Sequence, residues 1–110
     1  MTGLADNLFW VTVQPSETGM CVVVTGELDL ATAGRIEAEV IALLDAGCAT
    51  VEIDLRALEF MDSSGVHELL RCRDHAADWA VPLRLLVASG PQLRALTICA
   101  VLDRFDVEVD

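Results

Sequence analysis

The side chains best suited to chemistry lie close together in the chain: Asp62, Ser63, Ser64 and, four positions after Ser63, His67. Serine, histidine and aspartate are the residue types of a hydrolytic triad. However, the chain contains no G-x-S-x-G turn, and its 110 residues are few for a substrate cleft. We therefore expect that the protein is not an enzyme.

A capping role explains the same residues without catalysis. Aspartate and serine are preferred N-caps because their side-chain oxygens accept hydrogen bonds from unpaired N–H groups in the first turn of a helix. Asp62, Ser63 and Ser64 directly precede a predicted helix, and Asp29 and Thr32 stand in the same relation to an earlier one. Capping alone explains both groups of residues, unless they belong to a larger sequence motif.

The apolar pattern predicts the elements that position these residues, because its period switches cleanly between 2 and 3.6. Strands are predicted at 8–14, 20–25, 51–55, 82–87 and 105–110. Helices are predicted at 31–46, 64–79 and 91–102, with Gly47 ending the first. The segment 20–25 is almost continuously apolar and is expected to be a central strand.

The order ββαβαβαβ predicts an α/β fold: a single domain over residues 1–110 with a mixed sheet and helices packed mainly on one face. In such sheets, sites form at the carboxyl ends of the parallel strands. Three loops are expected there, at 26–29, 58–65 and 89–91. Leu58 and Phe60 are expected to anchor the second loop in the core, which leaves Asp62 and Ser63 on the rim.

The charge of the chain limits its partners. Eighteen acidic residues against seven arginines give a net charge of −11. This charge argues against binding to nucleic acid or to anionic membranes and favours proteins with basic patches. No apolar run approaches the roughly 20 residues that cross a bilayer, and residues 1–7 lack the basic start and apolar stretch of a secretory signal. We therefore expect a cytoplasmic protein.

The four cysteines, Cys21, Cys48, Cys72 and Cys99, are spaced too far apart for a C-x-x-C pair. With only two histidines in the chain, they do not form a zinc-binding pattern either. We expect four free, buried thiols in a reducing compartment, and neither a metal nor a cofactor.

Three motifs together resemble one protein family. They are Gly-Glu-Leu-Asp at 26–29, Asp54-Leu55 in the third strand, and Phe-Met-Asp-Ser-Ser-Gly at 60–65. This combination resembles the anti-sigma factor antagonists of the STAS domain family, and the resemblance covers nearly the whole chain. A Ser-Ser-Gly alone would be a weak signal, but the spacing of all three motifs makes it specific.

The resemblance implies a function and a set of site residues. Antagonists of this family bind an anti-sigma factor, an ATP-binding serine kinase with a histidine-kinase-like fold, and so release a sigma factor. The kinase then phosphorylates the antagonist on a serine that corresponds to Ser63. The implied partner-binding residues are Asp29, Asp62, Ser63, Ser64 and Gly65. A phosphate adds a charge of about −1.5 to −2, which a helix N-terminus tolerates, so the modification is expected to switch binding rather than unfold the chain.

Two points stay open within the resemblance. His67 stands where many relatives carry a small residue, and it is expected to be an exposed, neutral helix residue. Other STAS domains are scaffold or sensor modules of large assemblies, or the cytoplasmic ends of anion transporters. The short chain argues against a transporter but leaves the scaffold as an alternative. A monomer or weak dimer in gel filtration would favour the antagonist.

Overall fold

The computed structural model describes residues 9–110. Residues 1–7 and Leu8, which entered the expectations on targeting and on the first strand, lie outside this range. The strands are β1 (Phe9–Pro15), β2 (Met20–Leu28), β3 (Val51–Met61), β4 (Leu83–Val87) and β5 (Asp106–Val109). The helices are α1 (Arg35–Asp45), α2 (Ser63–Asp78) and α3 (Pro91–Ile98), followed by a short 3₁₀ helix, η2 (Leu102–Arg104). The predicted order of strands and helices is confirmed.

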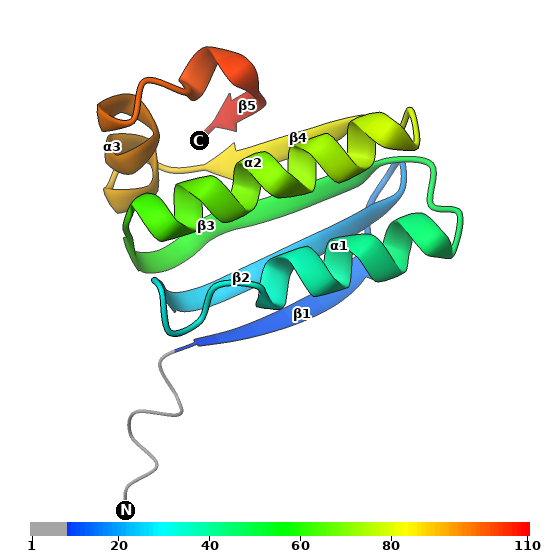
Figure 1. The fold of residues 1–110 in the computed structure, drawn as a ribbon, viewed down its shortest axis with the longest axis horizontal. Coiled ribbons are helices and arrows are strands. Elements are labelled where there is room, and N and C mark those ends of the chain that lie inside the picture. Colours follow the sequence, from blue (N-terminus) through cyan, green and yellow to red (C-terminus); the bar gives the residue numbers. More distant parts are fainter. Residues whose placement is uncertain (1–8) are drawn as a thin grey trace, which may run out of the picture.

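The five strands form one mixed sheet in the order β1-β2-β3-β4-β5. β1 pairs antiparallel with β2, and every later pair is parallel. α1 and α2 run side by side across one face of this sheet, and α3 stands at the end where α2 begins and β3 finishes (Figure 1). The α/β fold with helices mainly on one face is therefore confirmed.

The core lies between the sheet and its two long helices. Alternate strand residues point toward the helices and are buried, while the intervening residues face the other side. The helices contribute one apolar stripe each. The fully buried core side chains include Val22, Val24, Ile53, Leu55, Leu85 and Val87 from the strands, and Ile36, Val40, Val66 and Leu69 from the helices.

Two helices are shorter than predicted, for backbone reasons. α1 begins at Arg35 rather than at residue 31, because a turn occupies 30–34 and Gly34 takes a left-handed conformation with φ of 98°. α3 begins at Pro91 as predicted but ends at Ile98, because Ala100 is left-handed with φ of 57°. Gly47, also left-handed, follows the end of α1 as predicted.

The third strand is longer than predicted and overturns one expectation. β3 continues through Met61, so most of the expected loop 58–65 is strand and α2 itself. Its register against β2 shifts twice, between Val23 and Thr25 and between Gly26 and Glu27. The second shift changes the alternation of β3, so Leu58 is buried but Phe60 is 45% exposed. The expectation that Phe60 anchors the core is wrong.

Candidate functional site

The ends of β2 and β3 bring two sequence motifs together. Leu28 is the register partner of Met61, the last residue of β3. One residue later, the backbone N–H of Asp62 donates to the carbonyl of Leu28 at 3.3 Å. The turn that starts at Asp29 and the start of α2 therefore leave the sheet from adjacent points, as expected for the carboxyl ends of parallel strands.

Asp62 is the N-cap of α2. Its Oδ1 accepts hydrogen bonds from the backbone N–H of Ser64 at 2.9 Å and of Gly65 at 3.4 Å. A carboxylate here satisfies two N–H groups that lack helical partners and favours the positive end of the helix dipole. The capping function is thus performed by the aspartate and not by either serine.

Ser63 is the first residue of α2, and its side chain is exposed. Within residues 9–110, no hydrogen bond occupies the Ser63 hydroxyl, whereas Ser64 is half-buried. Gly65 is buried, and a Cβ built on it would lie 2.8 Å from side-chain atoms of Leu28 and Met61. The contribution of Gly65 to the site is therefore positional, because it lets the first turn of α2 approach the strand ends closely.

Asp29 organises the neighbouring turn. Its Oδ1 accepts from the backbone N–H of Ala31 at 3.0 Å and of Thr32 at 3.2 Å. The Thr32 hydroxyl accepts from the N–H of Asp29 and donates to the carbonyl of Glu27, both at 3.0 Å. These bonds cap a turn before α1 rather than α1 itself, and they hold Asp29 half-buried beside the end of β2.

A buried carboxylate that the sequence analysis did not single out links α2 to α1. Glu68 is fully buried, and its Oε2 accepts from the backbone N–H of Glu37 at 2.9 Å. Gly34, the N-cap of α1, has no side chain to do this, so Glu68 supplies the missing acceptor from the other helix. The only hint in the sequence is a glutamate next to the apolar stripe of α2.

The carboxylate of Glu37 is itself held by α2. Arg71 Nε donates to Glu37 Oε1 at 3.0 Å, and His75 Nε2 lies 2.7 Å from Glu37 Oε2. Burial alone would raise the pKa of Glu37, but the hydrogen bonds from His75 and Arg71 outweigh it and hold this pKa below its usual value. Glu68, Arg71 and His75 thus fix α1 against the helix that carries Ser63.

A buried amide ties the third loop to the same end of the sheet. Gln92, in the first turn of α3, donates from Nε2 to the carbonyl of Leu58 at 2.9 Å. This bond holds α3 beside the last part of β3 and therefore near the start of α2 (Figure 1). Ser89, which precedes α3, is exposed.

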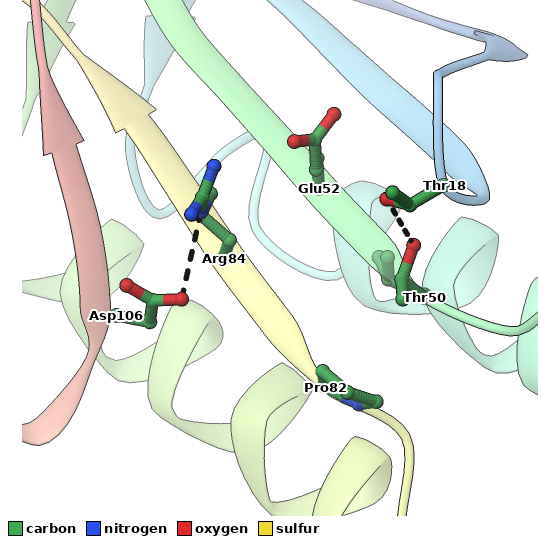
Figure 2. Close-up of a pocket in the computed structure, with 7 residues that line it drawn as sticks. Thr18, Thr50, Glu52, Pro82, Arg84 and Asp106 are labelled. Atoms are coloured by element: carbon green, nitrogen blue, oxygen red, sulfur yellow. Dashed lines mark hydrogen bonds and ion pairs between the residues drawn. The ribbon is translucent and has the colours of Figure 1, made fainter.

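A hollow of ≈ 200 Å³ lies among the first residues of β3 and β4, at the other end of these strands from Ser63. Figure 2 shows the side chains that line it. Thr18 and Thr50 bond each other across its rim at 3.0 Å, and Arg84 is paired with Asp106 at 3.5 Å. Because it lies at the opposite end of the strands from Ser63, it does not extend the site.

The four thiols are free. Cys21 and Cys72 are buried as expected, but Cys48 and Cys99 are only half-buried. In the part of the chain that the structure describes, no group of His, Cys, Asp and Glu residues is arranged to hold a metal ion. No helix among residues 9–110 is both long enough and apolar enough to span a bilayer.

Several solved structures share this fold. An anti-sigma factor antagonist from Mycobacterium paratuberculosis matches with a TM-score of 0.80 and 21% identity, over 90% of this chain and 84% of that one. A putative anti-sigma factor antagonist from Thermotoga maritima matches with a TM-score of 0.74 and 14% identity, over 91% and 86%. The antagonist SpoIIAA in its unphosphorylated form matches with a TM-score of 0.65 and 24% identity, over 90% and 87%.

No curated protein matches the sequence significantly. The STAS domain family model, in contrast, matches residues 10–110, which is nearly the whole chain and includes the motifs at 26–29 and 60–65. The chain belongs to the STAS domain family.

Proposed function

We propose that this STAS domain is an anti-sigma factor antagonist that is switched by phosphorylation of Ser63. In its unmodified form it binds a serine-kinase anti-sigma factor in the cytoplasm and so releases a sigma factor. The phosphorylated form no longer binds. Solved structures with this fold are of anti-sigma factor antagonists, one of them in its unphosphorylated form, and this supports the proposal.

The observation that carries the proposal is that Asp62 and Ser63 have different roles at the start of α2. Asp62 supplies the cap, so the exposed hydroxyl of Ser63 is free to accept a phosphoryl group without loss of a structural bond. A phosphate there lies at the positive end of the 16-residue helix α2, which stabilises negative charge. The fold is therefore expected to survive the modification.

The same charge weakens the contact with the kinase. Transfer requires Ser63 to lie beside the kinase-bound nucleotide, whose remaining phosphates are negative. A phosphoserine in that contact is repelled by them, and it must also lose water to fit. Asp62 and Asp29 add negative charge at the same rim, so the modified surface repels anionic groups more strongly than the unmodified one.

Phosphotransfer to single-serine variants tests the assignment. Each purified serine-kinase anti-sigma factor of the source organism is incubated with radiolabelled ATP and the wild-type chain, Ser63→Ala, Ser64→Ala or Ser89→Ala. Ser89→Ala is the matched control, since Ser89 is also exposed and also lies just before a helix. Loss of labelling in Ser63→Ala alone is expected, and full labelling of that variant would refute the assignment.

A further inference from the structure

The face of the sheet opposite α1 and α2 carries two exposed aromatic side chains. Trp10 is 46% exposed beside the buried Phe9, and Phe60 is 45% exposed beside the buried Met61. Trp10 of β1 is the register partner of Thr25 of β2, which is in turn the register partner of Ala57 of β3. Two residues further along β2, Glu27 is the register partner of Phe60 of β3. We call Trp10, Thr25, Ala57 and Phe60 the aromatic patch. It lies across β1, β2 and the last part of β3, on the face that the two long helices leave open (Figure 1).

The rest of this face differs from the aromatic patch. It carries two ion-pair groups, Asp54–Arg56–Asp110 and Asp106–Arg84–Glu108. Figure 2 shows Arg84 paired with Asp106 in the second of these groups. Paired charges of this kind are stable in contact with water. Exposed tryptophan and phenylalanine side chains are instead typical of the residues that a binding partner buries at the centre of an interface.

The aromatic patch is continuous with the proposed phosphoacceptor. Phe60 is followed directly by Met61, by the cap Asp62 and then by Ser63, so only two residues separate the aromatic patch from Ser63. Carboxylates flank the patch: Glu27 is opposite Phe60, and Glu59 is exposed next to it. An occupant that suits this surface has an apolar body and an arginine or lysine at its edge, which can pair with the carboxylates and stack on Trp10.

We propose that the aromatic patch is a second contact for the anti-sigma factor, which extends from Ser63 around the end of β3 onto the open face of the sheet. This inference rests on the proposed function, because its occupant is the same partner. A second copy of the chain is a poorer occupant, since each copy carries a net charge of −11 and Glu27 and Glu59 of each would face the other.

Calorimetry with a purified serine-kinase anti-sigma factor that binds the wild-type chain tests the inference. Trp10→Ala and Phe60→Ala are each expected to weaken binding at least about tenfold, or ~1.4 kcal/mol. Trp79→Ala is the matched control: Trp79 is 52% exposed but follows the C-terminus of α2, far from Ser63, and its loss is expected to leave affinity within about twofold. Melting temperatures identify any variant that is merely unfolded.

Fluorescence gives a second readout, in which the variant that reports on the patch keeps every side chain of the patch. In Trp79→Phe, Trp10 is the one indole left, and its emission is expected to shift to shorter wavelength when the anti-sigma factor covers it. In Trp10→Phe, only Trp79 remains, and no shift is expected. A Trp10 emission that does not change on binding would overturn the inference even if Trp10→Ala proved unstable.

The possible failures are distinguishable. If Trp10→Ala and Phe60→Ala bind as tightly as wild type while Ser63→Glu does not, the aromatic patch is wrong and the proposed function stands. If no serine-kinase anti-sigma factor binds the wild-type chain, both fall together. If sedimentation shows a dimer that the patch variants abolish without any change in anti-sigma affinity, the occupant is a second copy and the inference is overturned.

Discussion

The backbone N–H of Asp62 donates to the carbonyl of Leu28 at 3.3 Å, and this bond joins two motifs that are far apart in the sequence. The turn headed by Asp29 and the helix headed by Ser63 consequently leave the sheet at the same place. Because strand ends and helix caps fix the geometry of this surface, we expect a phosphate added to Ser63 to affect binding rather than folding.

The cap itself can be tested by removing its carboxylate. Asp62→Ala leaves the N–H groups of Ser64 and Gly65 without their acceptor and is expected to lower the free energy of unfolding by about 1 kcal/mol. Asp62→Asn keeps an oxygen acceptor and is expected to lose much less. Urea denaturation of the two variants measures the difference. Equal stability of Asp62→Ala and wild type would show that α2 is capped in another way.

The close approach of α2 to the strand ends predicts that Gly65 tolerates no side chain. In Gly65→Ala, the new Cβ would lie 2.8 Å from the buried side chain of Leu28 and from Met61, so both must shift. We expect a loss of about 1–3 kcal/mol in the free energy of unfolding. Ser64→Ala, one residue earlier in the same turn, is the control and is expected to change little. A Gly65→Ala variant as stable as wild type would contradict the packing described here.

The ion pairs of Glu37 predict a specific pH dependence. The pKa of Glu37 is lower in the folded chain than in the unfolded chain, so its ion pairs stabilise the fold above its ordinary pKa of 4.5, and this stabilisation is lost as the pH falls through the lower, folded value. Glu37→Gln is therefore expected to cost about 1 kcal/mol at pH 7 and progressively less below about pH 4. Denaturation of both proteins across this range measures the difference. A penalty that does not decline in acid would exclude the ion pairs as its cause.

The cysteines are expected to differ in reactivity, although all four are free. Burial, together with the nearby Asp54 carboxylate, raises the pKa of Cys21 to about 11, and burial likewise raises the pKa of Cys72. At pH 8, alkylation of the native protein is expected to modify Cys48 and Cys99 first. All four should react once the chain is unfolded without reductant. Fewer than four reactive thiols in the freshly purified protein, unfolded without reductant, would contradict the absence of disulfides.

Much of the fold could be predicted because apolar residues recur with a regular period within the strands and helices. The order of strands and helices along the chain and the start of α3 at Pro91 follow from period and capping chemistry alone. The face of the sheet that Phe60 occupies could not be predicted, because it depends on a shift in register between β2 and β3 next to Glu27, which the apolar pattern does not show. The start of α1 was likewise set by Gly34 and by the turn at Asp29 rather than by helix periodicity.

The site was predictable only where a local motif determines it. Asp62 and Ser63 are adjacent in the sequence, so their positions at the start of α2 could be expected, although not which of them is the cap. The link from Glu68 to the N-terminus of α1 joins residues that are distant in sequence. The role of this buried glutamate is clear only in the folded structure, where its Oε2 accepts from the N–H of Glu37, which has no partner within α1.

The most direct test of the account is the affinity of Ser63→Glu for a purified serine-kinase anti-sigma factor, measured by calorimetry alongside a thermal melt. We expect binding at least about tenfold weaker than wild type, with little change in melting temperature, because the helix N-terminus accommodates the charge. Ser89→Glu, with the same added charge at another exposed serine, is expected to bind nearly as wild type. If Ser63→Glu binds as tightly as wild type, the phosphoserine switch is wrong; if it unfolds, Ser63 is a structural residue and not a switch.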